Sequence, residues 1–341
     1  MHNSIVFSRF LSEMDEKFSA STDLNGLSSL RRMHSIRRMP YGRGRKYFTK
    51  VGAEPKLLSG LTTITKILEK QKGYYSVLAD WRATVGIEEA DQIAQETSVL
   101  GTFIHILCAE IAYVRQANDP AIFINLNDEF KEEFKRTMLE NGVRHRLLDD
   151  YYKRTLKAAQ SFNKWLDDWQ VEVVAIEWCV MDLDNNVCTP LDIVAYAVEP
   201  LSAAEKKRGG EEKRFLGNFN IKFREKADSV YTTDMLQTCI EMYMYNKYMT
   251  ESNPIERTFT ITPKSHSLAK YGCAVHEHTN KYTAEEYETD IAYAKMQAAH
   301  SDVFNPDMNV TLAISDMKIT RNGIEQKEAN SVYEYINSFF E

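Results

Sequence analysis

The amino-acid sequence predicts an α/β (α+β) fold, in which a central mixed sheet is flanked by helices and a helical elaboration precedes it at the N-terminus. Three observations predict this class. Residues 86–169 repeat their apolar side chains at helical spacing. At residue 171 the pattern becomes that of strands, and residues 171–198 are typical of a β-hairpin around the turn Asp184-Asn185-Asn186. From residue 215 onward, strand-like and helix-like segments alternate.

The first segment, residues 1–55, is rich in Ser, Arg and Gly and has weak periodicity, which predicts a basic N-terminal arm or peripheral helices. Its basic residues are concentrated in a stretch without acids, at Arg31, Arg32, Arg37, Arg38, Arg43, Arg45, Lys46 and Lys50. Stretches of this composition contact phosphates in nucleic-acid-binding proteins, and they also occur as solvated arms. The composition leaves both interpretations open.

Residues 56–341 are predicted to form the main domain, with its core motifs between residues 101 and 250. Before the hairpin, helices are expected at 76–81, 86–97, 101–115, 127–141 and 147–169. After it, strands are expected at 215–223, 257–262, 271–276 and 309–320, and helices at 232–248, 284–300 and 331–340. The segment 202–214 alternates basic residues with Glu and contains Gly209-Gly210, so it is expected to be a long exposed loop.

Composition limits the function classes. With 341 residues, 43% hydrophobic and 27% charged, the chain can bury a large core. It contains no run of about 18 apolar residues, so we expect no transmembrane helix and no membrane partner; residues 1–10 also lack the apolar region of a signal peptide. The net charge of −7 gives no general attraction to nucleic acid. The sequence lacks a Walker A motif, which argues against an intrinsic ATPase or helicase.

The five cysteines, at positions 108, 179, 188, 239 and 273, are scattered and form no C-x-x-C pair. This usage is typical of reduced thiols in a cytoplasmic protein. It argues against a structural zinc site and against an iron–sulfur cluster.

Two charged residues interrupt apolar strands and are the strongest candidates for a functional site. Asp192 lies between Leu191 and Ile193, and Lys222 follows Asn220-Ile221 on the next predicted strand. Burying an unpaired charge is costly, so we expect these charges to meet each other or a metal at the edge of a sheet. Because side chains alternate along a strand, Asn220 and Lys222 should share a face.

Two more polar residues extend this set. His105 lies one turn after Gly101-Thr102 in an apolar predicted helix, and Gln237 lies on the helix after the third strand. Hydrolysis of a phosphodiester uses a divalent cation to activate water and neutralise developing charge. Carboxylate and carbonyl oxygens suit Mg²⁺ and Mn²⁺, imidazole can contribute, and a neighbouring lysine can orient the water and offset phosphate charge.

In this order, the motifs resemble those of the PD-(D/E)XK nuclease superfamily, in its RecB-like and phage-exonuclease branch. The resemblance spans roughly residues 60–250. Its motifs are Thr62-Thr63-Ile64 with Leu68, then Trp81, Gly86 and Ala90, then Gly101-Thr102 with His105, then Asp192, then Asn220-Ile221-Lys222, and finally Tyr231 and Gln237.

The resemblance implies a restriction-endonuclease-like core and a metal-dependent exonuclease acting on double-stranded DNA ends or single strands. It implies that Mg²⁺ or Mn²⁺ is held by His105, Asp192, Asn220 and the Ile221 carbonyl. Lys222 would be the catalytic lysine, and Gln237 would steady the site. It further implies a protein of the bacterial cytoplasm, with a phage origin and a recombination or replication partner protein both open.

The chain departs from the family pattern at two ligand positions. Asn220 replaces the usual Asp or Glu, which removes a negative charge. Ala109 replaces a glutamate often found four residues after the histidine, and the next residue, Glu110, is a further candidate ligand. These departures motivate the alternative that the protein is a weakened or inactive nuclease-fold module for DNA binding or assembly. Glu177, on the first hairpin strand, is expected to point outward or to be paired.

Overall fold

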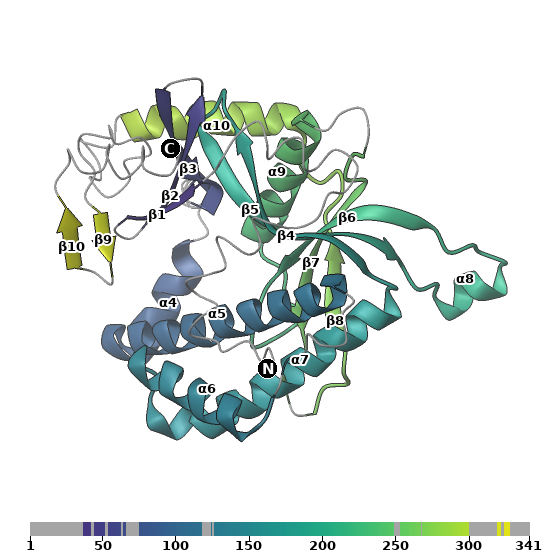
Figure 1. Cartoon of the computed structure of the whole chain (residues 1–341), viewed down its shortest axis with the longest axis horizontal. Coiled ribbons are helices and arrows are strands. Elements are labelled where there is room, and N and C mark those ends of the chain that lie inside the picture. The colour runs from purple at the N-terminus through teal and green to yellow at the C-terminus, as the bar shows by residue number, and fades with distance from the viewer. Residues whose placement is uncertain are drawn as a thin grey trace.

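The computed structural model has a mixed α/β architecture, with a sheet between two groups of helices (Figure 1). The structure describes residues 37–41, 44–51, 54–62, 64–65, 75–117, 124, 126–248, 253–266, 268–299, 319–321 and 324–327. The strands are β1 (Arg37–Tyr41), β2 (Gly44–Val51), β3 (Glu54–Gly60), β4 (Glu172–Asp182), β5 (Val187–Val198), β6 (Arg214–Ile221), β7 (Arg257–Pro263), β8 (Cys273–Glu277), β9 (Ile319–Arg321) and β10 (Ile324–Lys327). The helices are α4 (Tyr75–Val85), α5 (Ile87–Ala117), α6 (Asp128–Glu140), η2 (His145–Leu147), α7 (Leu148–Asp168), α8 (Ala203–Lys207), α9 (Thr232–Tyr248) and α10 (Ala284–Ala299).

The sheet is built around the long strand β5. Strands β4 and β6 pair with β5 on its two sides, both antiparallel, and β7 and β8 extend the sheet beyond β6. The β6–β7 pairing is parallel and is reached through helix α9, whereas β8 returns antiparallel to β7. The β1–β3 meander joins through a two-pair parallel contact between β3 and the start of β5.

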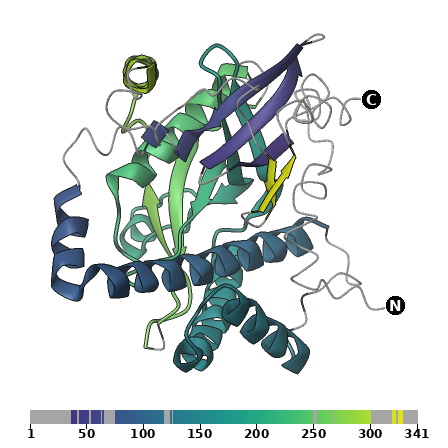
Figure 2. The same cartoon turned by 90° about the vertical axis from the view of Figure 1, so that its left-hand side faces the viewer.

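Each face of the sheet is covered by its own helices. Helix α5 packs on β4 and α7, and α7 reaches β7 and β8 (Figure 2). Helix α9 packs on β4, β6 and β7 from the other face, with α10 beside it. The core facing α5 and α7 is aromatic: Phe219 stacks on Phe259 at 5.1 Å and meets the edge of Trp165 at 5.1 Å.

Besides the register irregularity between Val173 and Ala175, the alternation of side chains in the β4–β5 hairpin breaks at a second place. Ile176 and Ile193, which are paired, lie in the core under α5 and α7. Trp178 and Leu191, which are paired two residues further along, lie in the core under α9. Residues two apart on a strand normally share a face, so each strand shifts phase between these pairs. The residues at the shift are Glu177 and Asp192.

Most predicted elements are present close to their expected bounds. The hairpin, the helix at 232–248 and the strand at 257–262 match β4–β5, α9 and β7, and Asn127 caps α6 through a hydrogen bond from the Phe130 amide. The segment 202–214 is exposed, as predicted, and also contains the short helix α8.

The separate helices predicted at 86–97 and 101–115 are wrong, because α5 runs unbroken through Gly101. Glycine costs about 1 kcal/mol inside a helix, but Leu100, Phe103 and Ile104 around it are buried, and their packing decides the outcome.

The N-terminal prediction is only partly within the described residues. Of the segment predicted as an arm or peripheral helices, 37–41 and 44–51 form strands instead. Residues 1–36, which include Arg31 and Arg32, lie outside the described residues, as does Arg43. The predicted strand at 309–320 is described only from residue 319, and the predicted helix at 331–340 lies outside.

Helix α5 is also long and apolar enough to cross a membrane by length and composition, although 56% of its most apolar window is buried inside the structure. Its packing here is that of a core helix, and its first half is fixed by an ion pair. Arg144, just before η2, donates from Nε and Nη2 to the two carboxylate oxygens of Glu96, each at 2.7 Å. The side chains of Gln92 and Gln95 donate to the backbone carbonyls of Gly142 and Asn141, just before Arg144.

The ion pair should make stability depend on pH. The side-chain hydrogen bonds from Arg144 lower the pKa of Glu96 to about 2, against an unfolded value of about 4.3. A depressed pKa contributes stability above the unfolded value, and this is lost as the pH falls toward 2. We expect Glu96→Gln to be less stable than wild type at pH 7, with the difference shrinking below about pH 4. Urea unfolding at pH 7 and pH 3.5, with exposed Glu132→Gln as control, measures this; an equal difference at both pH values would contradict it.

The aromatic core should carry much of the stability. Phe219→Ala removes a fully buried ring with four aromatic neighbours. We expect a loss of about 3–5 kcal/mol in the free energy of unfolding. Leu268→Ala, at a side chain that is 89% exposed, should change it by less than about 0.5 kcal/mol. Chemical denaturation of both variants checks the contrast, and similar losses would refute it.

Candidate functional site

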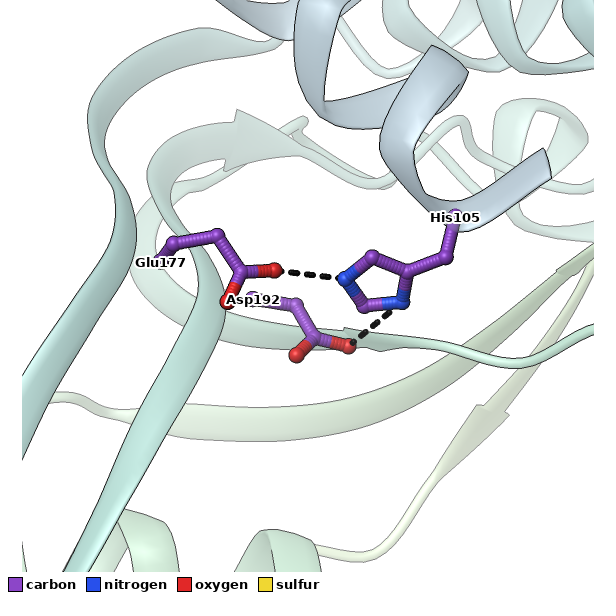
Figure 3. A group of neighbouring side chains, drawn as sticks. All are labelled: His105, Glu177 and Asp192. Atoms are coloured by element: carbon purple, nitrogen blue, oxygen red, sulfur yellow. Dashed lines mark hydrogen bonds and ion pairs between the residues drawn. The ribbon is translucent and has the colours of Figure 1, made fainter. Parts of the chain in front are cut away.

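Three ionisable side chains meet where the hairpin shifts phase. His105 comes from α5, Glu177 from β4 and Asp192 from β5 (Figure 3). His105 Nε2 lies 2.5 Å from Glu177 Oε1, and His105 Nδ1 lies 3.8 Å from Asp192 Oδ2. One ligand atom from each residue lies within 4.8 Å of the others. The group is only partly covered, since the side chain of His105 is 27% exposed.

The backbone places both carboxylates. Glu177 has a φ of 48°, in the left-handed region that residues other than glycine rarely occupy. Such strain costs on the order of 1–3 kcal/mol and clusters at functional sites. Asp192 is fixed differently: its Oδ2 accepts a hydrogen bond from the backbone amide of Ile221 at 2.7 Å, so its carboxylate sits at the join of β5 and β6.

Positive charge on His105 balances these two acids. Burial alone would lower the pKa of His105, but the charges of Asp192 and Glu177 outweigh it and raise the pKa to about 9. Burial raises the pKa of Asp192, an effect that the charge of His105 opposes and that of Glu177 reinforces. The imidazolium is therefore the cation that balances the two carboxylates. A metal cation bound by His105 would replace a proton of this ring, because only the neutral imidazole is a ligand.

A second polar group lies on the α9 side of the same strands. Lys222 follows directly on β6 and donates from Nζ to Gln237 Oε1 at 2.9 Å. Gln237 donates from Nε2 to Glu241 Oε1 at 2.8 Å, one turn further along α9. Asn220 donates from Nδ2 to the same carboxylate, at 3.3 Å from each oxygen. Asn220 and Lys222 thus reach the same helix, as their spacing of two predicted.

Glu241 couples the two groups electrostatically. It is fully buried, and burial together with the charge of Asp192 raises its pKa to about 7, against the hydrogen bonds from Asn218 and Gln237 and the charge of Lys222. Because the charge of Asp192 acts on Glu241 and that of Lys222 acts on both acids, the two groups form one electrostatic unit.

The structure brings most of the predicted site residues together, although on the interior strands β5 and β6 rather than at the expected edge of the sheet. His105 and Asp192 share one group, Asp192 bonds the backbone of Ile221, and Lys222 bonds Gln237. Glu110 is buried on α5 and is not part of the three-residue group. Of the basic residues, Arg37, Arg38, Arg45 and Lys46 lie on β1 and β2, in the meander beyond β5. The functional roles of all these residues stay predictions.

Two acids, Glu177 and Glu241, were not assigned to the site from the sequence. Glu177 was expected to point outward or to be paired; it is paired, but with His105 inside the group. The residues around Glu177 give little indication of this role, because its position opposite Asp192 becomes apparent only when the register of the hairpin is known. Glu241 lies four residues after Gln237 and is therefore on the same helix face. That spacing was available in the sequence and would have been sufficient to find it.

The donor set fits a hard divalent cation. One imidazole nitrogen and two carboxylate oxygens are ligands that Mn²⁺ and Mg²⁺ accept. Metal–oxygen bonds of about 2.0–2.6 Å place the ligands of one ion up to about 4–5 Å apart, and the group satisfies that spacing. No protein-family model matches the chain, and no curated protein matches it either.

If the group binds a cation, Glu177 should be needed for it. We expect Glu177→Gln to weaken Mn²⁺ binding at least about tenfold, because it removes one of two carboxylates; a tenfold change corresponds to about 1.4 kcal/mol. Glu172→Gln, on the same strand but exposed and paired with Arg214, should bind Mn²⁺ as wild type does. Isothermal titration calorimetry measures both, and equal affinities for the two variants would rule out Glu177 as a ligand.

Proposed function

We propose that this protein is a metal-dependent DNA exonuclease that hydrolyses phosphodiester bonds of linear DNA, with a site of the PD-(D/E)XK type. The observation that carries the proposal is the meeting of a helix histidine, a strand acid and a strand-end lysine where the pairing of the central strands β5 and β6 ends. His105 and Asp192 belong to one group, and the amide bonded by Asp192 belongs to the residue before Lys222.

The order of elements supports the same class of fold. Helix α5, the antiparallel strands β4–β6, helix α9 and the parallel strand β7 follow one another in the chain. A restriction-endonuclease-like core uses this order, which places the second and third strands side by side with their polar residues at one edge.

The roles follow from the contacts. His105, Glu177 and Asp192 would hold Mg²⁺ or Mn²⁺, with Asn220 and the Ile221 carbonyl as neighbouring oxygen donors. When bound, such a cation would supply a Lewis acid toward water and phosphate. Lys222 Nζ, held by Gln237 Oε1, presents an ammonium that can offset charge on a phosphate oxygen and orient water.

Side chains around Lys222 favour nucleic acid as the substrate. The guanidinium of Arg224 lies 4.1 Å from the centre of the Tyr231 ring, and that of Arg154 lies 5.1 Å from the centre of the Phe223 ring. Tyr231 is 57% exposed. Exposed aromatic rings of this kind stack on unpaired bases. The two guanidiniums are paired with Asp234 and Glu225, so the support for nucleic acid comes from the exposed Tyr231 ring and from the ammonium of Lys222.

A second candidate function rests on Asn220. If the amide leaves the site too weak for catalysis, the protein would bind DNA without cleaving it, as an assembly or DNA-binding module. Its binding would weaken steeply with salt.

Cleavage should depend on Asp192 and on Lys222 in different ways. We expect wild type with Mn²⁺ to degrade linear double-stranded DNA and to spare covalently closed circles. Asp192→Ala should lose both Mn²⁺ binding and degradation. Lys222→Ala should keep Mn²⁺ binding but lose at least about a hundredfold in rate, the usual range for a proton-transfer or orienting group.

Asp150→Asn and Lys153→Ala, both exposed on α7, serve as matched controls and should degrade DNA at the wild-type rate. Degradation that is equally fast in Asp192→Ala and wild type would end the catalytic proposal. DNA binding without cleavage by wild type would favour the binding module.

A further inference from the structure

Glu241 has an arrangement that packing alone does not require. Its carboxylate is fully buried and accepts hydrogen bonds from neutral groups: Gln237, Asn218 at 3.1 Å, Asn220, and Thr189 at 3.4 Å. None of these contacts comes from a cation. By contrast the buried Asp182, at the hairpin turn, is paired with Lys247 at 3.1 Å and bonded by Tyr287. A buried carboxylate normally needs such a pairing.

The neighbours of Glu241 are amides, and an amide has two different ends. Its NH₂ group only donates and its carbonyl oxygen only accepts, whereas an ionised carboxylate only accepts. Which way an amide is turned follows from its hydrogen-bond network. Beside Glu241, Asn220 and Gln237 must therefore both present their NH₂ groups to it.

The consequence is that both carbonyl oxygens face away from Glu241. Gln237 Oε1 receives the ammonium of Lys222. Asn220 Oδ1 is buried and has no hydrogen-bond partner among the described residues. Buried polar atoms normally have a partner, and a bound ion is one of the groups that can supply it where the protein does not.

The position of Asn220 in the sheet favours its carbonyl oxygen as the one that would bind a cation beside Asp192. The β5–β6 register pairs Ile193 with Phe219, so Asp192 and Asn220 are the next opposite residues. Asn218 also has an unpartnered carbonyl oxygen, but it is paired with Val194, two residues further from Asp192.

We propose that Glu241 is a positioning residue which turns Asn220 and Gln237 so that their carbonyl oxygens face the cation site and Lys222. The proposal rests on the proposed function. It also explains how an asparagine can stand where an acid is usual: the negative charge lies behind the amide, in the way that carboxylates behind metal-bound histidines orient their rings and strengthen them as ligands.

The test uses the difference between an amide and a carboxylate at position 220. Glu241→Gln can donate as well as accept, so Asn220 loses its fixed orientation, and we expect Mn²⁺ affinity to fall by about 10–100-fold. An aspartate at 220 has two equivalent oxygens and no wrong orientation. In the Asn220→Asp background, Glu241→Gln removes the charge but no orientation, so its loss of Mn²⁺ affinity should be at least about threefold smaller than in the wild-type background. Glu241→Asp, which still only accepts, should retain more affinity than Glu241→Gln.

Calorimetric titration of the full chain with Mn²⁺ alone measures these affinities, and thermal unfolding in EDTA reports stability separately. Asp182→Asn is the matched control: it removes a buried carboxylate outside the site, so it should lower stability and leave Mn²⁺ affinity unchanged. Equal losses from Glu241→Gln in both backgrounds, or no loss in either, would overturn the positioning role. If Asp192→Ala also binds Mn²⁺ as wild type does, the proposed metal site itself fails.

Discussion

The confinement of like charges at the centre of the sheet is the constraint on which this structure depends. Glu177, Asp192 and Glu241 act on one another through a largely dry interior, where carboxylates repel strongly. Each acid is held by a group from another element. The imidazolium on α5 holds Glu177, a backbone amide of β6 holds Asp192, and amide side chains on β6 and α9 hold Glu241. The elements must therefore assemble together for any of the charges to be tolerated.

The structure accepts local costs at the same place. The left-handed backbone of Glu177 is strained, and the raised pKa values of Asp192 and Glu241 show that each acid is less stable in its charged form than it would be in water. The other buried acid of the same hairpin carries no such electrostatic cost, since Asp182 at its turn is paired with Lys247 and has a lowered pKa despite its burial. The concentration of cost at one point argues for function rather than for a poorly packed hairpin.

Much of the fold followed from local patterns, and the exceptions have physical reasons. The hairpin and α9 were predictable because period and turn residues agree there. The continuity of α5 was not, because local propensity at Gly101 was overridden by packing. Asp192 and Lys222 were visible as charges in apolar strands. Glu177 was not, because regular alternation does not include the phase shift that turns it toward α5, and that shift depends on the helices covering each face.

Position 220 shows how a site can be misjudged from one motif. Along the strand, Asn220 looks like the loss of an acid, and with it the loss of a charge near the cation. Across the structure, a carboxylate lies 3.3 Å behind that amide, contributed by a helix that begins eleven residues after β6 ends. Electrostatic attraction depends on distance in space and not on separation in the sequence. The charge of Glu241, which lies behind the Asn220 amide, would therefore still act on a cation at the site. The weakening expected from Asn220 should accordingly be smaller than that of an isolated acid-to-amide replacement.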